Sequence, residues 1–135
     1  RSIREKAGLQ LLSPSGSAVA AYRSLRAGRL VVFVQDQRHN QGVSVPFFNR
    51  PALTSRGFGV LAARTGAPLF GAHQWRDERG RHHIRIERLN LEVPEDPDEA
   101  VLALTRASQK FYEDRIKLHP HSWLWLHDRW RANNE

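Results

Sequence analysis

The sequence predicts an α/β domain with a mostly parallel sheet, flanking helices and an antiparallel hairpin at one side. Stretches typical of strands alternate with stretches typical of helices along the 135 residues, as a parallel sheet requires. The run Leu30–Gln35 is short, β-branched and aromatic, as expected of a strand that is buried on both faces. His82–Leu89 instead alternates apolar and polar residues, which is typical of a strand with one exposed face.

The chain before Leu30 is predicted to hold one strand and one helix. Leu9–Leu12 is predicted as a short strand, and the turn residues Ser13–Ser17 supply a helix N-cap. The helix that follows is expected to run to about Ala27 and to end at Gly28.

A polar loop from Asp36 to Ser44 follows the predicted strand Leu30–Gln35 and closes with Gly42. Val45–Phe48 is then predicted as an apolar edge or loop. Ligands of parallel sheets bind outside the carboxyl ends of the strands, so Asp36 is the first residue to consider for chemistry. The alternative for Asp36 is an Asx turn that only ends the strand.

Two further helices and a hairpin complete the prediction. Thr54 is expected to cap a helix that ends before Gly66. Leu69–Trp75 and His82–Leu89 are expected to pair through the turn Asp77–Gly80. The second strand has Ile84 and Ile86 on one face and His83, Arg85 and Glu87 on the other.

The last helix has the clearest start signal. Asp96 is predicted as its cap, with Pro97 at the first helical position and Glu99 three residues after the cap. Its buried face is expected to carry residues that recur at helical spacing: Val101, Leu104, Ala107, Phe111 and Ile116.

Composition limits the classes of function. The net charge of +7 and the pI near 11 point toward anionic partners, either nucleic acid or an anionic membrane leaflet, although a merely solubilising surface fits equally well. The absence of cysteine from the sequence excludes disulfides, thiolate nucleophiles and zinc sites built on sulfur. The longest apolar run, Leu30–Val34, is far shorter than the roughly 18 residues of a spanning helix.

The chain begins with Arg1, and its first residues are a mixed-charge run without the apolar region of a signal peptide. We therefore expect a portion of a longer protein whose membrane contact in this part, if present, is peripheral.

A series of short motifs carries a resemblance over nearly the whole chain. The chain resembles the bacterial lipid A biosynthesis acyltransferases, the lauroyl and myristoyl transferases of the lysophospholipid acyltransferase superfamily. The motifs that match in order and spacing are Arg4 with Gly8, Leu25 with Gly28, Asp36-Gln37, Val45–Phe48, Thr54 with Gly57, Leu61-Ala62, Thr65–Pro68 and the tryptophan-rich tail Pro120–Trp130.

The resemblance implies an incomplete, glycerolipid acyltransferase-like domain, with residues 1–135 as its C-terminal part. Such enzymes move a fatty acyl chain from acyl carrier protein to a hydroxyl of a lipid A precursor at the cytoplasmic face of the bacterial inner membrane. They use a His-x4-Asp/Glu pair, which is expected upstream of this sequence, so this part alone is expected to be inactive. Related enzymes acylate other glycolipids, including mannosylated phosphoinositides, and the residues here do not distinguish the acceptor.

Two pairs in this sequence imitate the catalytic spacing. His82 and Glu87 are five residues apart on one predicted strand, so their side chains are expected on opposite faces. His73 and Glu78 begin in a strand and end in a turn. We expect neither pair to be catalytic.

The resemblance also implies roles for particular residues. Arg4 and Asp36 are expected to support catalysis, Arg4 by contacting a phosphate or the active-site wall and Asp36 by pairing with Arg4 or another cation. The residues expected to contact substrate are Gln37, Phe47, Phe48, Thr54 and Arg129. The alternatives are a solvated Arg4 and core packing for Phe47 and Phe48. Asn49 stands where the family usually has glycine and is expected to support a left-handed turn.

The tail and the histidines leave alternatives open. Trp123, Trp125 and Trp130, with His127 and Arg129, suit either a membrane interface or packing over the sheet. No metal site is expected, because the adjacent His82 and His83 point to opposite faces of a strand. No cofactor is expected either.

Two rival functions belong to other classes. A nucleic-acid-binding module is suggested by charge and by Arg56–Gly59, which copies the start of an RNA-recognition signature, but the following Val60 and Ala63 offer no base-stacking platform. The other rival is a non-catalytic basic domain that docks the acidic carrier protein or binds anionic lipid.

Overall fold

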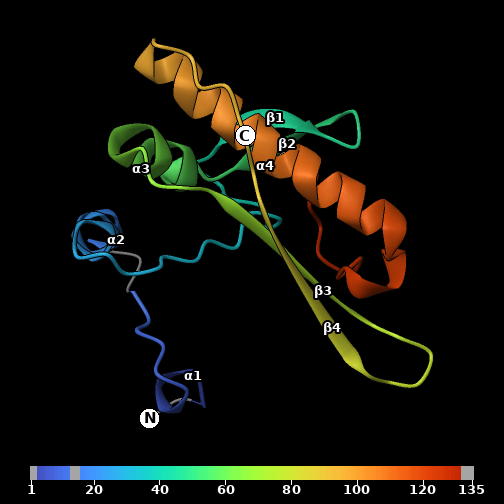
Figure 1. The fold of residues 1–135 in the computed structure, drawn as a ribbon. Coiled ribbons are helices and arrows are strands. Elements are labelled where there is room, and N and C mark those ends of the chain that lie inside the picture. Colours follow the sequence, from blue (N-terminus) through green and yellow to red (C-terminus); the bar gives the residue numbers. More distant parts are fainter. Residues whose placement is uncertain (1–2, 13–15, 132–135) are drawn as a thin grey trace. The chain divides into compact units, whose positions relative to one another are not determined.

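The structure is a computed structural model that describes residues 3–12 and 16–131 (Figure 1). The chain divides into two compact units, Arg1–Val32 and Phe33–Glu135, and each is described by itself. The single domain expected over residues 1–135 stays a prediction.

The described part of the first unit contains the helices α1 (Ile3–Lys6) and α2 (Ser17–Arg26). α2 confirms the predicted helix, and Gly28 follows it with a φ of 72°. The residue before the helix is Gly16, which provides no side-chain cap, and residues 13–15 of the expected cap lie outside the described residues. The strand predicted at Leu9–Leu12 is wrong, because these residues pair with no strand of the described chain, which a strand needs for its backbone hydrogen bonds.

The mixture of helices and strands agrees with the α/β class, but the mostly parallel sheet is not found. Both sheets among the described residues are two-stranded and antiparallel. The run Leu30–Gln35 carries no strand, and its Leu30, Val32 and Val34 side chains are exposed. The composition of this run was typical of a buried strand, yet none of its residues pairs with a described strand.

The first hairpin of the second unit pairs β1 (Val43–Phe47) with β2 (Arg50–Thr54). Phe48 and Asn49 form its two-residue turn with φ values of 50° and 58°, so the left-handed turn expected at Asn49 is confirmed. Val45–Phe48 is therefore mostly strand rather than loop. Thr54 ends β2 and does not cap the next helix, α3 (Gly57–Thr65), which follows Arg56 and ends at Gly66 as predicted.

The second hairpin, β3 (Phe70–Arg76) with β4 (His82–Arg88), confirms the predicted pairing. β4 is half-exposed, but its apolar face is the exposed one. Ile84 and Ile86 face solvent, while His83 and Glu87 on the other face are partly buried. The reason is that Glu87 forms an ion pair with a long helix that covers this face, described next.

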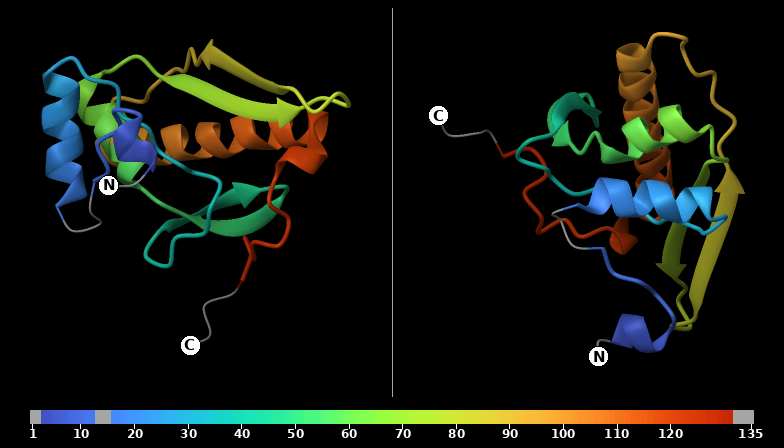
Figure 2. Two further views of the ribbon diagram at one scale, coloured as in Figure 1. Left: turned by 90° about the horizontal axis from the view of Figure 1, so that it is seen from below. Right: turned by 90° about the vertical axis from the view of Figure 1, so that its left-hand side faces the viewer.

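That helix, α4 (Pro97–Leu118), is the central element of the second unit. Its predicted cap is confirmed, because the Asp96 carboxylate accepts hydrogen bonds from the backbone nitrogens of Asp98 and Glu99. The two hairpins lie on opposite sides of α4, and α3 packs beside its first half (Figure 2). Of the predicted buried face, Val101, Leu104, Phe111 and Ile116 are buried.

A short 3₁₀ helix, η1 (Pro120–Ser122), begins the tail that returns across α4. The core contains the buried Phe47, Ala52 and Ile116, with Trp123 and Trp130 of the tail packed against them. Within the described residues, no helix is long and apolar enough to cross a membrane.

Candidate functional site

The segment that carries Asp36 is fixed by α4, by the tail and by one backbone hydrogen bond to β2, which His39 donates to the carbonyl oxygen of Leu53 at 3.1 Å. Gln35 is buried, and its carbonyl oxygen accepts a 2.8 Å hydrogen bond from Nε2 of Gln109 on α4. Asp36 is half-buried, and its Oδ2 accepts a 3.1 Å hydrogen bond from Nε1 of Trp123. The Asp36 carboxylate therefore has a defined position although no sheet strand precedes it.

The end of the tail binds the residues just after Asp36. The backbone nitrogen of Arg38 donates to Nε2 of His127 at 3.0 Å, and Nε of Arg38 donates to the carbonyl oxygen of Arg131 at 3.1 Å. These bonds join residues that are about 90 positions apart in the sequence, so the loop and the tail hold each other in place.

Arg129 lies beneath the loop and is fully buried. Its guanidinium donates to the carbonyl oxygen of Leu53 at 2.7 Å, to Oγ1 of Thr54 at 2.6 Å and to Oε1 of Gln109 at 2.9 Å. It also lies over the ring of Phe47, 5.2 Å from its centroid. Burial lowers the pKa of Arg129, and the Asp36 carboxylate acts in the opposite direction. Arg129 therefore joins β2, α4 and the tail through one buried cation.

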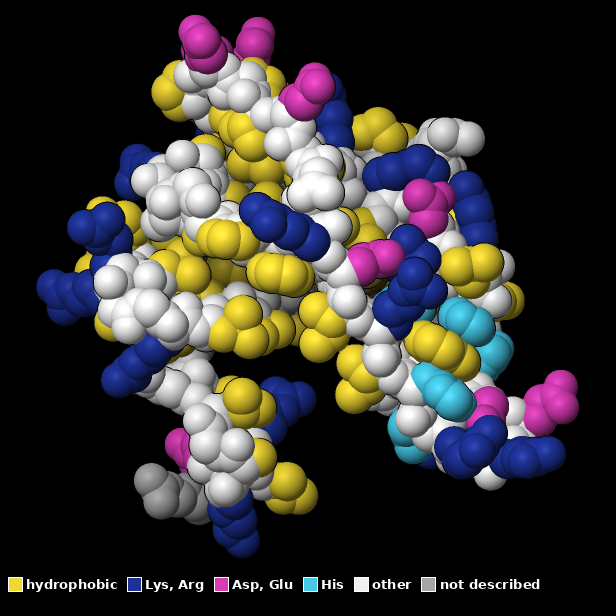
Figure 3. Space-filling view, viewed as in Figure 1, with side chains coloured by type: hydrophobic (Ala, Val, Ile, Leu, Met, Phe, Trp, Pro, Cys, Tyr) yellow, Lys and Arg dark blue, Asp and Glu magenta, His cyan; other side chains and the backbone are white. Residues whose placement is uncertain are grey.

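A cavity of about 330 Å³ opens beside Asp36. Its wall contains the side chains of Asp36, Tyr112, Trp123, His73 and Arg115. The remaining lining residues are Val34, Ala72, Gln74, Ile116, His119 and Ser122. All of them belong to the second unit, and histidine side chains gather over the β3–β4 hairpin (Figure 3).

Two titratable groups of the cavity, Tyr112 and His73, have shifted pKa values. The pKa of Tyr112 is raised by burial and by the Asp36 carboxylate, against a hydrogen bond with the backbone of Gln35. The pKa of His73 is lowered by burial and then by the positive charge of Arg115, so its imidazole is neutral near pH 7. Arg115 is paired with Glu87 at 2.7 Å.

These groups define the chemistry that the cavity offers. It combines a carboxylate, a neutral imidazole, a guanidinium that is partly balanced by a carboxylate, and aromatic faces. Two buried nitrogens, Nδ1 of His73 and Nε of Arg115, have no hydrogen-bond partner among the described residues. Hydrogen-bonding groups and ring faces of this kind suit a neutral ligand with several hydroxyls better than an isolated anion.

The structure separates the residues that the sequence proposed as one site. Asp36 lines the cavity, whereas Phe47, Thr54 and Arg129 are buried below it in the core. Gln37 is exposed, and Phe48 lines a different cavity beside α4. Arg4 is an exposed residue of α1 in the first unit. Its expected pairing with Asp36 remains a prediction, because the two units are described separately.

Sequence reasoning missed most of the cavity wall. His73 was considered only as one member of a pair with the catalytic spacing, and Tyr112 and Arg115 were not singled out. One signal was present: Phe111 and Arg115 are four residues apart, so a helix brings them to one face. The contact of that face with β3, however, depends on how the hairpin folds back.

The two pairs that imitate the catalytic spacing do not come together. His82 contacts Gln74 and Arg76 through its two ring nitrogens on the outer face of the hairpin, whereas Glu87 pairs with Arg115 on the inner face. His73 lies in β3, and Glu78 is exposed in the turn that follows it. Arg56–Gly59 stands at the start of α3, as predicted, so it is not on a strand that could stack bases.

The described residues contain no group of three or more histidine, aspartate and glutamate side chains placed to hold a metal ion. Trp123 and Trp130 pack against the core, as one alternative for the tail predicted, while Trp125 is exposed.

The second unit is thus a mixed α/β body with a cavity lined by polar and aromatic side chains beside a fixed carboxylate. Residues 1–132 match the family described as bacterial lipid A biosynthesis acyltransferase, and the chain belongs to this family. The resemblance found in the sequence motifs is thereby confirmed.

Two curated relatives carry the name phosphatidylinositol mannoside acyltransferase. They come from Mycobacterium tuberculosis strains CDC 1551/Oshkosh and ATCC 25618/H37Rv. Each is 29% identical to this chain over 135 residues, which cover 96% of the chain and 41% of the relative. The chain therefore spans less than half the length of these relatives.

Proposed function

We propose that this chain is part of an O-acyltransferase that transfers a fatty acyl group from an acyl carrier protein thioester to a hydroxyl of a glycolipid. The family match supports acyl transfer. The relatives named for phosphatidylinositol mannoside support an acceptor with a sugar head group, and a lipid A precursor is the other acceptor class of the family's description.

The observation that carries the proposal within this chain is the cavity beside Asp36. A sugar presents several hydroxyls on a ring, and the cavity presents Asp36 and His73 as acceptors, Arg115 as a donor and Trp123 as an apolar face. We infer that Asp36 accepts a hydrogen bond from an acceptor hydroxyl and thereby orients the sugar. The hydrogen bond from Trp123 holds the carboxylate in place for this contact.

The chemical step is assigned to the His-x4-Asp/Glu pair that the family resemblance implies. The imidazole removes the proton of the acceptor hydroxyl, and the oxygen attacks the thioester carbonyl. The carbon–sulfur bond then breaks, and the imidazolium returns the proton to the leaving thiolate, which releases the carrier thiol. No residue of this chain is assigned to that proton transfer. Asp36 is instead a binding residue, so its loss is expected to weaken acceptor use rather than to abolish the chemistry.

The test is acyl transfer by the complete protein that carries this sequence, with the acceptor concentration varied. Asp36→Asn is expected to lower kcat/KM for the acceptor by about tenfold or more, as the loss of a charge-assisted hydrogen bond requires. Asp98→Asn is the control, because Asp98 is exposed at the start of α4 and contacts Arg56. Unchanged acceptor kinetics in Asp36→Asn for both a mannosylated phosphoinositide and a lipid A precursor would contradict the proposal.

We further propose that the protein works at the cytoplasmic face of the bacterial inner membrane and that this part contacts the surface peripherally. Support comes from three consecutive exposed apolar side chains in the tail, Leu124, Trp125 and Leu126, on a chain with a net charge of +7. The proposed contact is limited to this turn and does not include the broader tryptophan set expected from the sequence, because Trp123, Trp130 and Arg129 are engaged in the core.

A further inference from the structure

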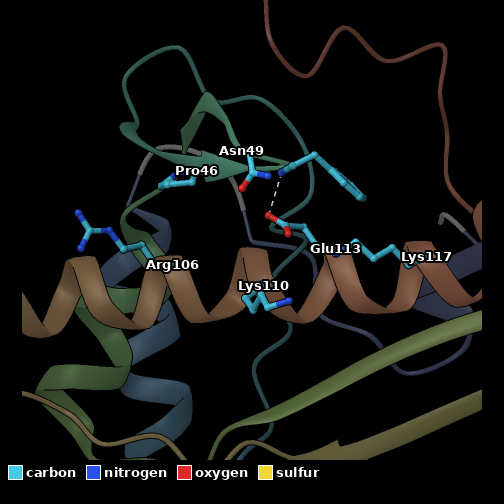
Figure 4. A pocket seen from close by; sticks show the side chains of 7 residues that line it. Pro46, Asn49, Arg106, Lys110, Glu113 and Lys117 are labelled. Carbon is cyan, nitrogen blue, oxygen red and sulfur yellow. Dashed lines mark hydrogen bonds between the residues drawn. The ribbon is translucent and has the colours of Figure 1, made fainter.

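A second cavity, of about 440 Å³, lies between the β1–β2 turn and α4 (Figure 4). We call it the α4 groove. Three cations from one side of α4 line it, Arg106, Lys110 and Lys117. The other lining residues are Pro46, Phe48, Asn49 and Glu113. The proposed acyl transfer assigns no role to this groove, and none of its residues lines the cavity beside Asp36.

The groove has an excess of positive charge. Three cationic side chains and one carboxylate line it, and Asp114 pairs with Lys110 from outside the lining, which leaves a formal charge of +1. One oxygen of Glu113 is already engaged by the hairpin, because its Oε1 accepts a 2.8 Å hydrogen bond from the backbone nitrogen of Phe48 (Figure 4). Asp114 lies outside the lining, and its Oδ1 accepts a 2.6 Å hydrogen bond from Nζ of Lys110, which raises the pKa of Lys110. Lys110 therefore stays protonated at physiological pH.

The hairpin side of the groove is held in an uncommon backbone conformation. Phe48 has a φ of 50°, a left-handed conformation that bulky side chains rarely adopt because it costs energy. The bond to Glu113 holds its backbone, and Nζ of Lys117 lies 5.8 Å from the centroid of its ring. A two-residue hairpin turn of this type requires positive φ at both central residues, so the turn itself fixes the shape of this wall of the groove.

The geometry points to a phosphate group as the ligand of the α4 groove. A phosphate monoester carries close to two negative charges and three terminal oxygens, whereas the phosphodiester of a lipid head group or of a carrier-protein arm carries one negative charge and two free oxygens. Both are attracted by the positive lining and can accept hydrogen bonds from its cations. The guanidinium of Arg106 offers paired N–H donors, and the two ammonium groups act as point charges. Asn49 adds a neutral amide at the edge of the groove (Figure 4).

The test measures binding to the complete protein with three probes: inorganic phosphate, 4′-phosphopantetheine, and vesicles that contain phosphatidylinositol. The double variant Lys110→Gln/Lys117→Gln is expected to weaken binding about tenfold, since each exposed charge contributes up to roughly fivefold. The matched control Arg79→Gln/Arg88→Gln removes the same charge from the β3–β4 hairpin and is expected to bind as the parent does. All four side chains are exposed, so both variants are expected to unfold at the parent temperature.

The three probes distinguish the source of the phosphate. Tightest binding of phosphopantetheine assigns the groove to the acyl donor arm, tightest binding of vesicles assigns it to a lipid head group, and equal binding assigns it to a free phosphate. The inference is overturned if no probe shows saturable binding or if the control variant loses as much affinity as the groove variant. Asp36→Asn is expected to keep phosphate affinity, so failure of this inference is separable from failure of the proposed acyl transfer.

Discussion

At the residue scale, Arg129 shows how one buried cation orders three segments of the chain. Arg129→Met is expected to destabilise the protein by about 3 kcal/mol, because the half-buried Leu53 carbonyl and the buried acceptors of Thr54 and Gln109 lose their donor. Urea unfolding monitored by tryptophan fluorescence measures the change. Arg131→Met, at an exposed position, is the control and is expected to change stability by less than about 0.5 kcal/mol. Equal unfolding free energies of the two variants would contradict the role of Arg129.

His73 is expected to make stability depend on pH. Its folded-state pKa lies below the ordinary value of 6.5, so the unfolded chain takes up the proton first as pH falls. The contribution of His73 to the free energy of unfolding is therefore complete above about pH 6.5, and it is lost as the pH falls from there through the folded-state pKa. Arg115, His119 and Arg85 disfavour the charged imidazole, while Glu87 favours it.

The measurement is the unfolding free energy in urea at several pH values between about 7.5 and 5. His73→Phe is expected to flatten the decline of stability over this range, while His39→Phe, at an exposed imidazole, is expected to retain it. A decline that is identical in His73→Phe and in the parent protein would assign the pH dependence to other groups.

At the element scale, the contact between α3 and α4 depends on the absence of a side chain at Gly59. A Cβ at this position would lie 2.6 Å from the carbonyl oxygen of Val101 and 2.9 Å from Oγ1 of Thr105. Gly59→Ala is therefore expected to destabilise by about 1 to 3 kcal/mol, although alanine alone favours a helix by up to about 1 kcal/mol. In Gly57→Ala the nearest atoms are 3.4 and 3.5 Å away, and no loss is expected. Chemical denaturation compares the two, and equal stabilities would contradict the close packing.

Elements with strong local signals could be predicted from the sequence. Asp96-Pro97 fixed the start of α4, Gly66 the end of α3, and the alternation at His82–Leu89 the second strand of a hairpin. The strand predicted at Leu30–Gln35 failed because a strand also needs a partner, which local composition cannot supply. The burial of β4 was not predictable either, since the ion pair of Glu87 with Arg115 reverses the face that alternation favours.

The candidate site was predictable only in part. Asp36 was found from its motif, and the structure places it on a cavity wall. His73 and Arg115 reach the same cavity from β3 and α4, and 42 positions separate them in the sequence. Contacts at such separations depend on the packing of hairpin against helix, and no local pattern specifies them.

At the scale of the whole molecule, the net charge of +7 and the exposed turn Leu124–Leu126 are expected to act in the same direction on the proposed membrane contact. In that proposal, positive charge draws the protein toward anionic head groups, and the apolar side chains then enter the interface. Leu124 and Leu126 are 64% and 94% exposed, so replacing them is not expected to disturb the core. Leu124→Ser/Leu126→Ser is expected to weaken binding to anionic vesicles about tenfold or more, from the lost burial of two leucines.

Vesicle sedimentation of the complete protein measures this effect. A control variant that removes two apolar side chains elsewhere separates it from nonspecific attraction of exposed apolar surface to the vesicles. Ile84→Ser/Ile86→Ser removes two apolar side chains of β4 that are 69% and 67% exposed, and it is expected to leave vesicle binding unchanged. Higher salt is expected to weaken the binding of the parent, because it screens the attraction to anionic lipid. If the isoleucine variant loses as much binding as the leucine variant, exposed apolar area in general attracts the protein to membranes. If neither variant loses binding, the tail turn has another partner, and the membrane contact proposed for it is wrong.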